Sequence, residues 1–158
     1  MHSVELIFAG VLGLGLLALT IIDARTYRLP DWLTLPLIAV GLTASVVLDK
    51  SLWLHGLGAV LGYGALVAIE LSYKRLRGRD GLGRGDAKLL AAGGAWCGAL
   101  ALPFIVLAAS LSALIYALVL RLVFARSLDG SSAIAFGPFL AFGIALIYAL
   151  QTSGLFAY

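Results

Sequence analysis

Two aspartates lie where charged and apolar sequence meet, Asp23 within LALTIIDARTYRLP and Asp86 within GRGDAKLLAAGGAW. An ionised carboxylate at membrane depth costs about 2.5–3.5 kcal/mol on insertion scales, so each needs a reason to be there. Taken singly, Asp23 could pair with Arg25 or Arg28, and Asp86 could cap a helix whose dipole favours negative charge. Taken together, two carboxylates at one depth indicate an acid–base dyad.

Such a dyad would hydrolyse a peptide bond. Two close carboxylates cannot both ionise cheaply, so they share a proton. The ionised member takes a proton from a water molecule, and the protonated member donates to the carbonyl under attack, without a metal or a covalent intermediate. Gly83 and Gly85 precede Asp86, and because glycine lacks a Cβ they let a substrate backbone come close and permit unusual dihedral angles.

The segments that must position these residues are apolar. Hydrophobic residues make up 62% of the 158 residues, charged residues only 12%, and the mean hydropathy is +1.06. A soluble domain carries about twice that share of charge. The sequence therefore predicts an all-α, polytopic transmembrane helix bundle that forms one domain, residues 1–158. Cys97 is the single cysteine, and His2 and His55 follow no ligand spacing, so neither a metal nor a cofactor is predicted.

About six segments are long enough to cross, or nearly cross, a hydrocarbon core about 30 Å thick. They cover residues 4–22, 31–48, 52–72, 86–101, 102–124 and 133–151. The fourth is short, which suits a helix that begins inside the protein. Pro103 and the small residues of WCGALALPF allow a tight turn before the fifth. Small residues at i, i+4 spacing would let helices approach closely: Gly58 and Gly62, Gly94 and Gly98.

The basic residues predict the orientation. Of the eleven Lys and Arg residues, only Lys50 lies in an even-numbered loop, so the odd loops face the cytoplasm and both termini face outward. The start MHSVELIFAG has no basic n-region, so a cleaved signal peptide is not predicted. Loop 74–88 is basic, and we interpret it first as an anchor to anionic lipid headgroups, worth about 1 kcal/mol per basic residue.

Other acidic residues have structural roles available. Asp31 follows Pro30 and is expected to cap the second helix. Glu70 is expected to pair with Lys74, four residues later on the same helix. No nucleic-acid partner is predicted, and the oligomeric state is left open.

The stretch Gly83-Arg84-Gly85-Asp86 is a G-x-G-D motif. With IIDARTYRLPDWLTLPL before it and AFGPFLAFG after it, nearly the whole chain resembles the type IV prepilin peptidase family of GxGD intramembrane aspartic proteases. The resemblance implies that Asp23 and Asp86 are catalytic. It also implies substrate-binding or site-shaping roles for Gly83, Gly85, Lys88, Phe136, Gly137, Pro138 and Phe139.

The resemblance further implies an endopeptidase of the bacterial cytoplasmic (inner) membrane. Such an enzyme cuts the basic leader from type IV prepilins or pseudopilins after a glycine, at the cytoplasmic face. Loop 74–88 could then contact an acidic substrate residue just past the cut, and Gly137-Pro138 either presents an extended backbone to the substrate or simply starts a helix. Longer members carry an N-terminal region with a cysteine-bearing loop, associated with N-methylation. Here Met1 lies directly before the first span, so methyltransferase activity is not predicted.

Two other interpretations stay open. A proton-coupled transporter would also use membrane carboxylates such as Asp23 and Asp86, together with glycine-broken helices. Both aspartates lie near one surface rather than at the midplane, and an inverted repeat is not evident, which favours the protease. A non-catalytic membrane scaffold is the third interpretation.

Overall fold

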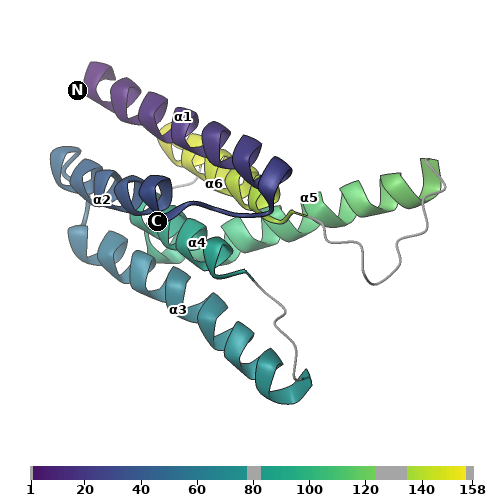
Figure 1. Ribbon diagram of the computed structural model, residues 1–158. Coiled ribbons are helices and arrows are strands. Elements are labelled where there is room, and N and C mark those ends of the chain that lie inside the picture. The colour runs from purple at the N-terminus through teal and green to yellow at the C-terminus, as the bar shows by residue number, and fades with distance from the viewer. Residues whose placement is uncertain (1, 78–82, 124–134, 156–158) are drawn as a thin grey trace.

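The computed structural model describes residues 2–77, 83–123 and 135–155, and every regular element within them is helical. In Figure 1, α4 lies in the middle of the bundle and packs against α2, α3, α5 and α6, while the far half of α5 extends away from the other helices. The predicted all-helical bundle is confirmed. The elements in chain order are α1 (His2–Thr26), α2 (Asp31–Val47), α3 (Leu52–Arg77), α4 (Arg84–Cys97), the 3₁₀ turn η1 (Ala99–Ala101), α5 (Leu102–Val123) and α6 (Gly137–Thr152).

The helices follow the predicted segments, with shifted ends. Helix α3 continues to Arg77, past the predicted end at residue 72, because Lys, Arg and Leu are good helix formers that can extend a helix beyond the apolar layer. Helix α4 begins at Arg84, so Asp86 lies within its first turn. Residues 74–77 of the predicted loop 74–88 belong to α3 and residues 84–88 to α4, while residues 78–82 lie outside the part that the structure describes.

Within the residues that the structure describes, three stretches are long and apolar enough to cross a membrane by themselves: Ser3–Thr26, Leu52–Leu76 and Ala99–Leu122. Helices α2 and α6 are shorter apolar helices. Helix α4 has 14 residues, a length of about 21 Å, and residues 89–97 are all buried by the surrounding protein. The exact number of spans and the outward position of both termini remain predictions.

Helix α1 is apolar on all sides, yet it turns one face inward. Leu12, Leu16, Leu19 and Asp23 are buried, and their spacing of four, three and four residues places them on one side of the helix. Leu14, on another side, is 71% exposed and faces the surroundings of the bundle. Asp23 therefore lies on the same inward-facing side of α1 as the three buried leucines.

Helices α3 and α4 touch through glycine. A Cβ on Gly58 would lie 2.5 Å from the Gly94 carbonyl oxygen, and one on Gly62 would lie 2.7 Å from the Leu90 carbonyl oxygen. The predicted close approach is confirmed for these glycines. Gly98 has a different role, because its φ of +84° ends α4 while its N–H donates to the Gly94 carbonyl oxygen at 2.8 Å.

The turn between α4 and α5 lies within WCGALALPF, as predicted, but Gly98 and η1 make it. Pro103 instead occupies the second position of α5, where the N–H it lacks would have no partner within the helix. The end of α4 is also held by a side chain, since Gln151 Nε2 donates to the Cys97 carbonyl oxygen at 3.0 Å.

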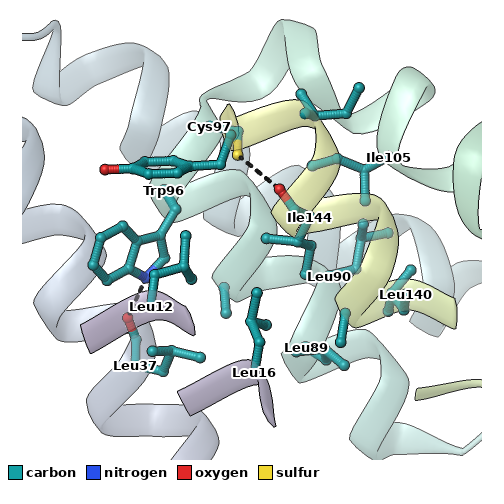
Figure 2. Packing of buried hydrophobic residues seen from close by; sticks show 14 of the residues in the cluster. Leu12, Leu16, Leu37, Leu89, Leu90, Trp96, Cys97, Ile105, Leu140 and Ile144 are labelled. Carbon is teal, nitrogen blue, oxygen red and sulfur yellow. Dashed lines mark hydrogen bonds between the residues drawn. The ribbon is translucent and has the colours of Figure 1, made fainter. Parts of the chain in front are cut away.

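Trp96 joins α4 to its neighbours at the packed centre (Figure 2). Its Nε1 donates to the Leu37 carbonyl oxygen of α2 at 2.8 Å, and its ring meets Tyr148 of α6 edge-on, with ring centroids 5.9 Å apart. Gly41 leaves room for the indole, because a Cβ there would lie 2.6 Å from Trp96 Cδ1. Lipid tails are as apolar as these side chains, so close packing and hydrogen bonds hold the helices together. This packing fixes α4, whose first turn carries Asp86.

Candidate active site

Asp23 lies in the last turn of α1 and is 5% exposed. The helix ends when Tyr27 adopts a left-handed conformation, with a φ of +53°, and its N–H donates to the Asp23 carbonyl oxygen at 2.8 Å. A short linker then leads to Pro30, the residue before α2. The backbone of Asp23 is therefore held at the point where the chain leaves the bundle core.

The carboxylate of Asp23 meets the start of α6. The Gly137 N–H donates to Asp23 Oδ2 at 3.0 Å, in a buried contact. The end of α1 and the start of α6 accordingly lie side by side in Figure 1. The alternative of an ion pair with Arg25 or Arg28 is wrong, because both arginines are exposed and no salt bridge between them and Asp23 occurs in the described segments.

Asp86 is half-buried in the first turn of α4. Gly83 is the N-cap, and the Asp86 N–H donates to its carbonyl oxygen at 3.0 Å. The alternative that Asp86 is the N-cap is therefore wrong, and no side-chain capping hydrogen bond forms at this helix end. The carboxylate still lies where the positive end of the helix dipole stabilises negative charge.

Both aspartates line one half-open cavity of about 290 Å³, enough for several water molecules. The end of α1, the linker between α1 and α2, and the start of α4 form its wall. The structure thus brings together two carboxylates from distant parts of the sequence. The lining residues are Asp23, Tyr27, Arg28, Leu29, Gly83, Arg84, Gly85 and Asp86.

The two glycines of the G-x-G-D motif differ in what they do. A Cβ on Gly85 would lie 2.9 Å from Leu29 Cβ, so glycine lets the start of α4 pack against the α1–α2 linker. Gly83 has an ordinary φ of −74° and ψ of 129°, and Gly85 lies within the helix, so the expected unusual dihedral angles are not found. Among the residues that the structure describes, the nearest atom to a Cβ on Gly83 would be Asp86 Oδ2, at 3.5 Å. Packing therefore explains Gly85, whereas Gly83 lies beside the Asp86 carboxylate in the cavity wall.

Two ion pairs hold the start of α4. Arg84 Nε lies 3.6 Å from Oε1 of Glu70, a buried residue of α3. Lys88 Nζ donates to Asp31 Oδ1 at the start of α2. The predicted capping role of Asp31 is wrong, because Pro30 is the N-cap, no side-chain capping bond forms there, and the Asp31 carboxylate turns to Lys88. Lys88 therefore contacts α2. It is not one of the residues that line the cavity.

The predicted site residues Phe136, Gly137, Pro138 and Phe139 lie at the start of α6. Phe136 is the N-cap with φ −85° and ψ −24°, and Gly137, Pro138 and Phe139 are already helical, so the plain helix start is confirmed and the extended backbone is not found. Phe139 packs on Tyr116 of α5, with ring centroids 5.4 Å apart. Of the four, Gly137 donates a hydrogen bond to a predicted catalytic residue, Asp23.

The cavity wall includes residues that the sequence did not predict as part of the site. Tyr27, Arg28 and Leu29 form the linker after Asp23, and Arg84 lies inside the G-x-G-D motif. The available signal was their position, directly after one aspartate or directly before the other. Over the segments that the structure describes, no group of three or more His, Cys, Asp or Glu side chains is placed to hold a metal ion.

The sequence matches a known protein family. A profile of the type IV leader peptidase family matches residues 10–118. The prepilin leader peptidase/N-methyltransferase of Escherichia coli (strain K12) is 46% identical over 132 residues, covering 80% of this chain and 56% of that protein. The protein of the same name from Dichelobacter nodosus is 39% identical over 158 residues, covering 96% of this chain and 52% of that protein.

The chain spans about half the length of these curated relatives. No solved structure matches it. Two carboxylates in one cavity suit peptide hydrolysis, and the matched profile covers both of them. The chain belongs to the type IV leader peptidase family.

Proposed function

We propose that this chain acts as a prepilin leader peptidase in which Asp23 and Asp86 form the catalytic pair. The observation that carries the proposal is the shared cavity, because a dyad requires two carboxylates within reach of one water molecule. Membership of a peptidase family supports hydrolysis, and the names of the relatives support prepilins as substrates.

In the proposed reaction, a water molecule in the cavity lies between the two carboxylates. The ionised aspartate accepts a proton from this water as its oxygen forms a bond to the scissile carbonyl carbon, and the protonated aspartate donates to the carbonyl oxygen. The tetrahedral gem-diol then collapses and the C–N bond breaks: the leaving nitrogen takes up a proton from one aspartate, and one hydroxyl group returns its proton to the other aspartate as it becomes the new carbonyl, which restores the shared proton. Arg28 and Arg84 line the cavity, and in the proposed reaction their guanidinium groups donate to main-chain carbonyl oxygens of the substrate.

The substrate segment must be extended, since a helix shields its carbonyl groups within its own hydrogen bonds. We place this segment beside Gly83, which lines the cavity next to the Asp86 carboxylate. In the proposed orientation the cavity faces the cytoplasm at the inner membrane, and the cut follows the last glycine of a basic leader on a type IV prepilin or pseudopilin. Arg75, exposed near the end of α3, would then lie among anionic lipid headgroups.

The test is cleavage by the purified protein in detergent, with a prepilin as substrate and intact-mass spectrometry of the products. We expect one cut after the leader glycine, and its loss in Asp23→Asn and in Asp86→Asn. Asp49→Asn is the matched control, because Asp49 is exposed in the α2–α3 loop, and asparagine tolerates its left-handed φ of +55°.

Far-UV circular dichroism and melting temperature must show that each variant is folded. Cleavage that persists in either cavity variant would overturn the assignment of the pair. A folded wild-type protein that leaves every prepilin intact, but takes up protons in liposomes through Asp23 and Asp86, would favour the transporter.

A further inference from the structure

We propose that Gly137 is a positioning residue for the Asp23 carboxylate, through both its amide and its missing side chain. The inference rests on the proposed function, because positioning matters if Asp23 acts on the substrate. It adds a residue on α6 to a site whose cavity wall comes from α1, the α1–α2 linker and α4.

The amide contribution is a single directed hydrogen bond. The Gly137 N–H lies 3.0 Å from Asp23 Oδ2. The next residue, Pro138, has no N–H, and the Phe139 N–H donates to the Phe136 carbonyl oxygen at 3.1 Å. Of the first three residues of α6, Gly137 is therefore the one whose amide is directed at the carboxylate. This bond ties Oδ2 of Asp23 to α6, while Asp23 also lines the cavity.

The missing side chain matters equally. A Cβ on Gly137 would lie 2.5 Å from Asp23 Oδ2, 3.0 Å from Asp23 Cγ and 3.3 Å from Asp23 Cβ. The three nearest atoms thus all belong to one side chain. A methyl group here would displace a carboxylate, which can rotate, and would leave the backbone of α6 in place. Gly137→Ala is therefore a perturbation aimed at the orientation of Asp23.

The start of α6 is fixed well enough to act as a reference point. Phe136 is half-buried against the hydrophobic core, and Phe139 packs on Tyr116 of α5. Leu140, in the same turn, is fully buried. Because packing anchors both ends of this turn, the Gly137 amide stays in place and the Asp23 side chain adapts to it.

The first measurement is prepilin cleavage by Gly137→Ala, with Gly64→Ala as the matched control. Gly64 lies in α3, where a Cβ would meet nothing within 4 Å. We expect kcat to fall about 100-fold in Gly137→Ala, because displacing a reacting group by about 1 Å costs roughly that factor. We expect KM to change less than about 2-fold and the control to behave as wild type. A Gly137→Ala protein with the kcat of the control would overturn the proposal.

The second measurement needs no substrate and separates this inference from the proposed function. Gly137→Ala should lower the melting temperature by roughly 2–12 °C through overpacking. In an Asp23→Ala background the carboxyl group is gone, so the same substitution should lower it much less. Equal shifts in both backgrounds would show that Gly137 does not act on Asp23. If the wild-type protein cleaves no prepilin but the two shifts differ, the proposed function fails and the placement of Asp23 by Gly137 stands.

Discussion

The contact between α3 and α4 offers a matched test within one helix. Gly58 and Gly64 both lie in α3, and alanine raises the helix propensity by about 1 kcal/mol at either position. A Cβ on Gly64 would meet nothing within 4 Å, whereas a Cβ on Gly58 would lie 2.5 Å from the Gly94 oxygen and 2.8 Å from the Ala99 nitrogen. Because these are backbone atoms, rotation of a side chain cannot relieve the overlap, and α3 must move away from α4.

The size of the effect follows from this geometry. Carbon and carbonyl oxygen atoms in contact lie about 3.3–3.6 Å apart, so the two helices must separate locally by about 1 Å. Overpacking of this kind costs about 1–3 kcal/mol, while the gain in helix propensity is common to both variants and cancels. At roughly 2–4 °C per kcal/mol, Gly58→Ala should melt about 2–12 °C below Gly64→Ala.

The assay is thermal unfolding of both variants in one detergent, followed by circular dichroism, together with prepilin cleavage below the transition. Cleavage should also fall in Gly58→Ala, because α4 carries Asp86 in its first turn and moves with the contact. Equal melting temperatures for the two variants would refute the argument that backbone contact at Gly58 sets the distance between α3 and α4.

Three further outcomes are expected. Gly85→Ala would place a Cβ 2.9 Å from Leu29 Cβ and push the α1–α2 linker off α4, so cleavage should fall; unchanged cleavage would contradict this packing. The cleavage rate should pass through a maximum with pH, since one aspartate must be ionised and the other protonated; a flat profile speaks against the pair. Trp96→Phe removes the 2.8 Å bond to the Leu37 carbonyl oxygen, which should cost about 1 kcal/mol and lower the melting temperature by about 2–4 °C; an unshifted transition would show that the bond contributes nothing.

Helix positions could be predicted because each apolar segment is bounded by polar or turn-forming residues, such as Pro30 before α2 and Asp49 after it. The buried face of each helix could not. Leu14 and Leu16 are the same residue type two positions apart, yet they are 71% and 4% exposed. In a helix that is apolar on every side, only packing against the neighbours decides which leucine turns inward.

The candidate site was predictable to a similar degree. The G-x-G-D motif and the apolar helix ends predicted that Asp23 and Asp86 belong together, and they line one cavity. The contact of Asp23 with Gly137 could not be predicted, because it joins residues 114 positions apart and depends on how α6 lies along α1. Asp31 likewise has the sequence context of a helix cap, but the position of Lys88 across the α2–α4 contact decides its partner.

In the proposed reaction, Asp23 and Asp86 act on one water molecule. The most direct measurement is an experimental structure of the protein in a lipid bilayer, at a resolution that shows ordered water. We expect one water molecule in the cavity within about 3.2 Å of a carboxylate oxygen of each aspartate. Two carboxylates that face separate compartments, with no water in reach of both, would contradict it.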